Sequence, residues 1–214
     1  SAAGGVDHDT LVAQAETLFG YLPARSAPSY DKAQYHGGES RELKDLEQAH
    51  MALAFEGPGY RDDNFYAAQI YSSALGGGMS SRLFQEIREK RGLCYTIFAQ
   101  SGAYADTGMT TIYAGTSAEE LGDLAMLTID EMKRAADDMS QPEIERARAQ
   151  MKAGLLMGLE SPASRAERMA RMVQIWETVP PIEETVARID AVTLADVLGF
   201  AETQAASAAP SLAL

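Results

Sequence analysis

The chain has 214 residues, of which 46% are hydrophobic, so it can bury a sizeable core as one large domain or as one domain plus a fragment. Its formal net charge is −13 at pH 7, from 18 basic and 31 acidic residues, which argues against a nucleic-acid partner. No apolar run approaches membrane-spanning length, so we expect no membrane span.

The first part of the chain is predicted as a helix followed by a linker. Asp7 or Asp9 can cap a helix whose apolar face includes Leu11 and Leu18. Prolines and serines between Tyr21 and Asp31 then favour irregular structure. This stretch is the best candidate for a domain boundary.

The middle of the chain predicts strands that flank a helix. Residues 34–44 are weakly strand-like, whereas residues 48–56 alternate clearly between apolar and other positions. A helix is expected from Asp62 or Asp63 to Leu75. Two further strands, at 95–104 and 109–115, are joined by a stretch with the Asp and Gly chemistry of a hairpin turn.

The second half reads as helices with well-marked starts, before an Ala/Ser-rich tail at 205–214 that we expect to be frayed. The capping patterns are Ser117 with Glu120, Ser140 with Glu143, Ser161 before Pro162, and Thr193 with Asp196. Strands followed by helices, without β-α-β alternation, predict an α+β fold with an antiparallel sheet.

Between these halves lies the segment GGGMSSRLFQEIREKRGLCY, residues 76–95. Ser80 or Ser81 can cap a helix after the glycines, and Gly92 is placed to end it. Arg88 then falls in the last helical turn and Tyr95 at the start of the next strand, so a chain reversal could aim both side chains at one point. The simpler interpretation is a solvated arginine and a tyrosine at the edge of the core.

The sequence carries no recognisable metal or nucleophile motif. Its histidines, His8, His36 and His50, are too far apart to form the paired ligands of a zinc helix, so we expect no metal site in this chain. Cys94, the only cysteine, lies in an apolar run and is expected to be a buried thiol. The glycines at 76–78 lack the lysine of a P-loop, which favours a structural loop.

The segment at 76–95, followed by Asp106-Thr107-Gly108 and by YAGT at 113–116, closely resembles the second domain of the insulinase-like, or M16-type, zinc peptidases. The nearest branch is that of the bacterial relatives of the mitochondrial processing peptidase, and the resemblance extends roughly from Val6 to Ala201. It implies an α+β domain of the M16 and LuxS-like metalloenzyme type, with five or six antiparallel strands covered by helices on one face.

The resemblance also implies a division of the chain. Residues 1–22 are expected to close the preceding M16 domain, 23–31 to form the linker, and 32–204 to form the C-terminal M16 domain. The tail at 205–214 follows it.

In these peptidases two halves close around a peptide, and the zinc and its base lie in the first domain of one half. An Arg and a Tyr from the second domain of the opposite half reach into that site. Arg88 and Tyr95 match this pair, seven positions apart, and so are the expected catalytic and substrate-binding residues. The resemblance implies a domain that walls a peptide chamber and does not cleave alone.

The same resemblance implies the cofactor and the partners. Zn²⁺ is expected in the first domain of the parent protein or partner, with no cofactor in this chain. The partners are that first domain, an extended or unfolded polypeptide substrate, and a second chain in a homo- or heterodimer.

A different class of function stays open: a non-catalytic scaffold resembling the core subunits of respiratory complexes. Whether the parent is an enzyme is therefore undecided at this point. A single cysteine fits a reducing compartment without proving one, which favours the cytoplasm slightly and leaves the periplasm open.

Overall fold

The computed structural model describes residues 1–23, 30–207 and 209–214. Its contacts define two compact units, of which one joins Ser1–Lys32 with Ala153–Pro181 and the other joins Ala33–Lys152 with Ile182–Leu214. Most of the expected linker at 23–31 falls outside the described residues, so the domain boundaries stay a prediction. The grouping of residues 153–181 with the N-terminal segment had no counterpart in the sequence analysis.

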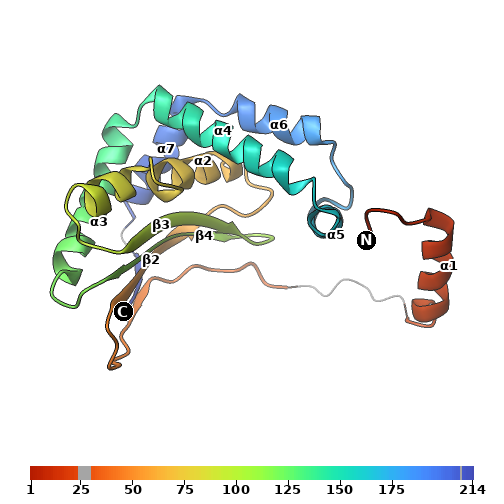
Figure 1. Ribbon diagram of the computed structural model, residues 1–214, viewed down its shortest axis with the longest axis horizontal. Helices are drawn as coiled ribbons and strands as arrows, with labels where there is room; N and C mark the ends of the chain where they lie inside the picture. The colour runs from red at the N-terminus through yellow and green to blue at the C-terminus, as the bar shows by residue number, and fades with distance from the viewer. Residues whose placement is uncertain (24–29, 208) are drawn as a thin grey trace. The chain divides into compact units, whose positions relative to one another are not determined.

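The larger unit is built on a five-stranded sheet with the order β1-β5-β2-β4-β3 (Figure 1). Its strands are β1 (Gly38–Ser40), β2 (Ala49–Gly57), β3 (Thr96–Ala103), β4 (Gly108–Thr116) and β5 (Ser211–Ala213). The pairs β2·β4, β3·β4 and β2·β5 are antiparallel, whereas β1 and β5 are parallel. The predicted α+β fold with its largely antiparallel sheet is therefore confirmed.

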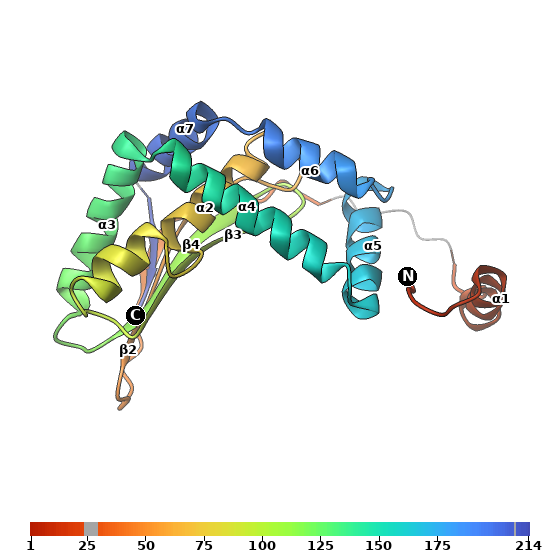
Figure 2. The same ribbon diagram turned by 45° about the horizontal axis from the view of Figure 1, so that its top comes forward.

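Helices cover one face of this sheet (Figure 2). The larger unit contains α2 (Phe65–Gly76), α3 (Leu121–Asp138), α6 (Ile182–Ala191) and α7 (Leu194–Ala205), together with most of α4 (Gln141–Gly158). The predicted alternation along β2 is confirmed, because Met51, Leu53 and Phe55 are buried while His50 is exposed. The apolar positions of β2, β3 and β4 thus form the core beneath the helices.

Helix α2 packs closely against the edge strand β3. A Cβ atom added at Gly76 would lie 2.3 Å from the backbone nitrogen of Ala99, so only glycine allows this approach. About two turns earlier, Gln69 Nε2 donates a hydrogen bond to the carbonyl of Ser101 on β3 at 2.9 Å. The helix therefore covers backbone groups that an edge strand would otherwise expose.

The C-terminal segment corrects one expectation. Residues 205–214 were expected to fray, yet Ser211–Ala213 forms β5 between β1 and β2. Backbone hydrogen bonds fix it, because Leu214 donates to Ser40 and receives a bond from Glu42. Helix α6 was also not predicted, although Ile189 on it is buried.

Several predicted helix caps are present. Asp7 accepts a hydrogen bond from the Thr10 amide at 2.9 Å, and its hydrogen bonds with Thr10 lower the pKa of the Asp7 carboxyl. Ser161 caps α5 (Pro162–Trp176), and Thr193 with Asp196 forms a complete capping box at α7. The sequence therefore marked these helix starts correctly.

The smaller unit has no buried residue in α1 (His8–Phe19) or in α5. The apolar face predicted for α1 is largely exposed, with Leu18 60% and Phe19 59% accessible to solvent. No helix among the described residues is both long and apolar enough to cross a membrane.

Candidate functional site

The segment before Tyr95 forms a widened helical turn in place of the predicted α-helix. Element η1 (Phe84–Glu89) is a π-helix, and the Lys90 amide bonds to the Gln85 carbonyl, five residues earlier, at 3.0 Å. The turn begins without a side-chain cap, so the expected cap at Ser80 or Ser81 is not formed, and the Ser81 hydroxyl donates to the carbonyl of Gly78 at 2.6 Å. Gly92 has a φ of +68° and ends the turn, as the sequence predicted.

The turn brings Arg88 and Tyr95 together, although the contact is made by backbone and not by the phenol. Arg88 Nε donates to the carbonyl oxygen of Tyr95 at 2.8 Å, and Nη1 donates to Oε1 of Glu89 at 2.9 Å. The guanidinium carbon also lies 4.5 Å from the centre of the Phe84 ring. Arg88 is therefore fixed from three directions while its side chain keeps 33% exposure.

The Tyr95 side chain projects from this fixed backbone. Its amide donates to the carbonyl of Gly115 on β4 at 3.1 Å, which holds the residue at the entry of the sheet. The side chain is 76% exposed, and its hydroxyl has no hydrogen-bond partner within residues 1–23, 30–207 and 209–214. A phenol held in this way can donate a hydrogen bond to an oxygen supplied by another molecule.

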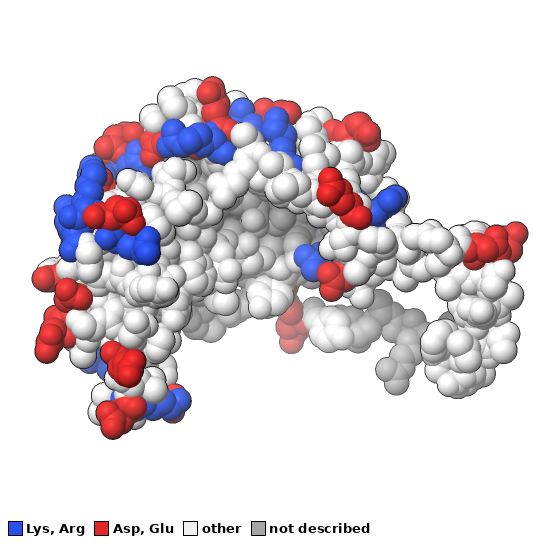
Figure 3. Space-filling view, viewed as in Figure 1, with Lys and Arg blue, Asp and Glu red and all other residues white. Residues whose placement is uncertain are grey.

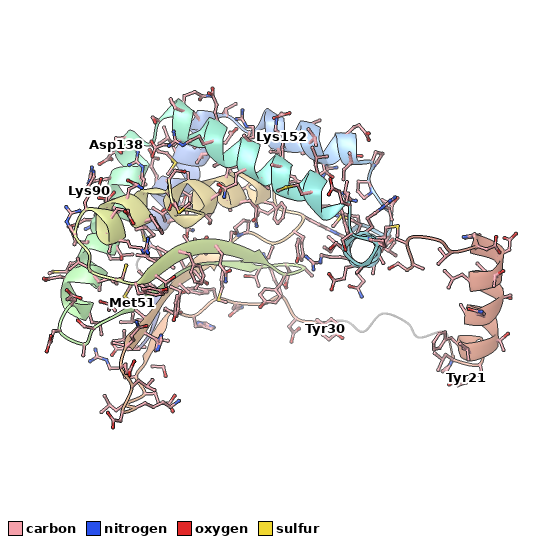
Figure 4. The ribbon with its side chains drawn as sticks, viewed as in Figure 1. Tyr21, Tyr30, Met51, Lys90, Asp138 and Lys152 are labelled. Carbon is pink, nitrogen blue, oxygen red and sulfur yellow. The ribbon has the colours of Figure 1, made fainter. Side chains whose placement is uncertain are left out.

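A half-buried ion-pair group anchors the start of the same segment. Arg82 binds Glu143 through Nε at 2.6 Å and through Nη2 at 2.9 Å, and it also contacts Asp138 at the end of α3, which Figure 4 labels. Its side chain is only 13% exposed. Burial raises the pKa of Glu143, but hydrogen bonds from Arg82 and Ser140 outweigh this and bring it to about 2.

Sequence reasoning missed this ion-pair group. Arg82 was interpreted only as part of a motif, and its partners come from the junction of α3 and α4, 56 and 61 positions later. Half of the predicted Ser140–Glu143 pattern is present, since Glu143 accepts from the Ser140 amide at 2.9 Å. The same carboxylate therefore caps α4 and binds Arg82.

The remaining candidates do not form a reactive centre. Cys94 is buried, and burial raises the pKa of its thiol, so it is a core residue as predicted. Within the described part of the chain, no group of three His, Cys, Asp or Glu side chains could hold a metal ion. His50 lies on β2 with Nδ1 2.7 Å from the Tyr113 hydroxyl, and so is paired with a tyrosine and not with other metal ligands. The residues that the structure describes do not fit a zinc site.

A cavity of about 530 Å³ lies beside the start of β2. Its walls come from the 41–48 segment, from the approach to α3 and from the C-terminal end of the chain, and they include Leu46, His50 and Leu121. This cavity could not be predicted from the sequence, because it is formed by segments that are far apart in the chain.

The fold and the site together define an α+β domain that presents an anchored arginine and an exposed tyrosine at one end of its sheet. The sequence matches the family described as "Peptidase M16 inactive domain" over residues 1–151. An "Uncharacterized zinc protease" of Rickettsia bellii is 39% identical over 212 residues, which cover 99% of this chain and 52% of the relative. The protein YmxG of Bacillus subtilis, named in the same way, is 34% identical over 205 residues, covering 94% and 49%.

The chain therefore belongs to the M16 peptidase family and carries its inactive domain, which confirms the resemblance found in the sequence. It spans about half the length of the curated relatives that it matches.

Solved structures share the fold. A chain of Complex III2 from Candida albicans with Inz-5 bound superposes with a TM-score of 0.87 at 22% identity, covering 98% of this chain and 52% of that chain. A protease from Helicobacter pylori gives a TM-score of 0.81 at 19% identity, covering 99% and 53%. At these identities the likeness establishes the fold alone.

Proposed function

We propose that this chain is the C-terminal domain of a zinc metalloendopeptidase, in which it walls a peptide chamber and supplies Arg88 and Tyr95 to the zinc site of the opposite half. Two findings support the family context: membership of the M16 family and relatives named zinc proteases that are about twice as long. The observation that carries the proposal is that the Arg88 guanidinium holds the Tyr95 carbonyl while the Tyr95 side chain is exposed, with no hydrogen-bond partner for its hydroxyl among the described residues.

The chemistry follows from these two side chains. When a peptide carbonyl is attacked, negative charge grows on its oxygen, and a phenol can stabilise this charge by donating a hydrogen bond. Arg88 uses Nε and Nη1 within the described chain, so Nη2 remains available to a substrate carbonyl. The planar guanidinium is suited to this because its donors have fixed directions.

This chain alone is not expected to cleave peptides. Its three histidines do not fit a zinc site, and no step of the proposal passes through a metal that this chain holds. The zinc that the names of the relatives imply would be bound by the rest of the parent protein or by a partner. Extended or unfolded polypeptides are the proposed substrates, because a closed chamber excludes folded proteins.

A scaffold role is the second candidate. The chain superposes on a protein of Complex III2 at least as well as it does on a protease, with TM-scores of 0.87 and 0.81. Fold likeness therefore does not separate the two roles. A scaffold has no use for the Tyr95 hydroxyl.

Replacement of Tyr95 by phenylalanine in the complete parent protein tests the proposal. We expect cleavage of an unstructured peptide to slow by about 10²–10³-fold, the loss typical of one oxyanion donor. Bound zinc and the oligomeric state should not change. Tyr104→Phe is the matched control, because Tyr104 is 60% exposed just beyond the opposite end of β3 and should tolerate the change.

Equal cleavage by wild type and Tyr95→Phe would show that the Tyr95 hydroxyl takes no part in the reaction. The domain would then only form part of the chamber wall. A wild-type protein that binds no zinc and cleaves nothing would favour the scaffold role.

A further inference from the structure

Three rings from neighbouring strands meet on the face of the sheet opposite to the helices. His50 on β2 stacks on Tyr113 on β4, with ring centres 6.0 Å apart, and its Nδ1 lies 2.7 Å from the Tyr113 hydroxyl. Phe98 on β3 also contacts Tyr113, with ring centres 5.2 Å apart. Phe98 is 39% exposed and His50 is exposed, so this aromatic cluster (His50, Phe98 and Tyr113) is not part of the core.

The face that carries the aromatic cluster is poor in charge. The strand registers place twelve side-chain positions of β2, β3 and β4 on it: His50, Ala52, Ala54, Glu56, Thr96, Phe98, Gln100, Gly102, Met109, Thr111, Tyr113 and Gly115. Glu56 is the one carboxylate among them, and none is Lys or Arg, in a chain with 31 acidic and 18 basic residues. In Figure 3 the charged side chains gather over the helices and the 39–47 segment, away from β3 and β4.

A sheet face in contact with water normally carries polar and charged side chains. An open face with exposed rings and few charges is suited to a covering polypeptide.

The aromatic cluster lies at the same end of the sheet as Tyr95. His50 pairs with Gly115, whose carbonyl accepts the Tyr95 amide at 3.1 Å. A Cβ atom at Gly115 would lie 3.8 Å from the Tyr113 hydroxyl and 3.2 Å from the Gln48 side chain, so glycine keeps this end of the face open. The cavity beside the start of β2 also has His50 in its wall.

We propose that the aromatic cluster is a specificity subsite that binds an aromatic or large apolar side chain of an extended polypeptide substrate. The proposal rests on the proposed function, because it assigns the polypeptide on this face to the substrate that reaches Tyr95. The rings supply the apolar contact and fix the register of the substrate relative to Tyr95.

The imidazole adds one polar contact. Because Nδ1 of His50 is engaged by the Tyr113 hydroxyl, Nε2 is the ring nitrogen left to face the substrate. Nε2 donates to a peptide carbonyl in one tautomer and accepts from a peptide amide in the other. Either way the subsite holds the backbone next to the bound side chain.

Peptide binding to the complete parent protein tests this subsite without relying on cleavage. A metal chelator prevents turnover, and fluorescence anisotropy measures Kd for a dye-labelled unstructured peptide series in which one Phe, or Ser in its place, occupies successive positions. We expect wild type to bind the Phe peptide more tightly than the Ser peptide at one position. In Phe98→Ala the ratio of the two Kd values should fall by about 3–10-fold, while the Kd of the Ser peptides stays unchanged.

Met109→Ala is the matched control, because Met109 is also 39% exposed and occupies the far end of the same face. Met109→Ala should keep the preference for Phe. Tyr113→Phe removes only the hydroxyl that orients His50 and should weaken both peptides by about 2–5-fold. Thermal unfolding of each variant establishes that the fold is retained.

The proposal is overturned if wild type shows no preference for Phe at any position, or if Phe98→Ala and Met109→Ala lose the preference equally. Failure of the proposed function would appear elsewhere, as unchanged cleavage by Tyr95→Phe, and the two results are independent.

Discussion

The two halves of the Gly76–Tyr95 segment use the same residue type for different purposes. Arg82 is 13% exposed and is enclosed by two carboxylates, whereas Arg88 is 33% exposed and is held by a carbonyl, a ring and one exposed glutamate. The first arginine anchors the segment to α3 and α4, and the second supports the backbone of Tyr95. The surroundings, not the residue type, separate a stabilising arginine from one that serves a site.

The largest effect on this contrast is expected from the removal of Arg82, which anchors the segment. Arg82→Ala leaves the half-buried Glu143 without its partner, so we expect a loss of about 3–5 kcal/mol in the free energy of unfolding. Denaturant unfolding measures the change. Arg41→Ala is the control, because Arg41 pairs with Glu39 at the surface and its loss should cost under about 1 kcal/mol. Similar losses of stability in Arg82→Ala and Arg41→Ala would contradict the anchoring role of Arg82.

Acid should weaken the ion pair between Arg82 and Glu143. The folded-state pKa of Glu143 is about 2 and its ordinary value is 4.5, so the carboxylate contributes stability that is fully present above about pH 4.5. That contribution is lost as pH falls towards about 2, and it amounts to at most about 3 kcal/mol. Between these pH values, the free energy of unfolding should fall more steeply for wild type than for Glu143→Gln. Parallel pH profiles would show that Glu143 does not titrate as described.

The smallest expected effect comes from a conservative substitution of Arg88, the arginine assigned to the site. Arg88→Lys keeps the charge but loses the planar set of donors, so we expect kcat/KM of the complete protein to fall by about 10-fold with stability almost unchanged. Arg91→Lys is the control, because Arg91 binds Glu86 in the same turn and is not assigned to the site. The assignment of Arg88 fails if the two variants have equal kcat/KM.

Local patterns predicted the parts of the fold that local chemistry determines. The alternation of Met51, Leu53 and Phe55 identified a strand, and Thr193 with Asp196 identified a helix start. The β5 strand was missed because three residues of an Ala/Ser-rich tail have no pattern of their own, and pairing with both neighbours makes them a strand. The π geometry of η1 was missed because no spacing in the sequence distinguishes it from an α-helix.

The candidate site shows the same limit. Gly92 predicted the reversal that brings Arg88 to Tyr95, but the sequence could not indicate that the arginine binds the Tyr95 carbonyl. The aromatic cluster needed the register of three strands, which places Tyr113 between His50 and Phe98. In the sequence, His50 is recognisable only as a histidine too far from the others to pair with them, and Tyr113 only as part of a motif.

The position of β5 has a consequence for the order in which the sheet is assembled during synthesis. The β2 and β3 strands each pair with β4, and all three are made before residue 117. Among the described strands, β1 pairs with β5 alone, so it has no sheet partner until residues 211–213 leave the ribosome. Such a long-range contact forms late because the intervening chain must first be ordered. The earliest strand of the sheet is therefore the last to join it, because it waits for residues 211–213.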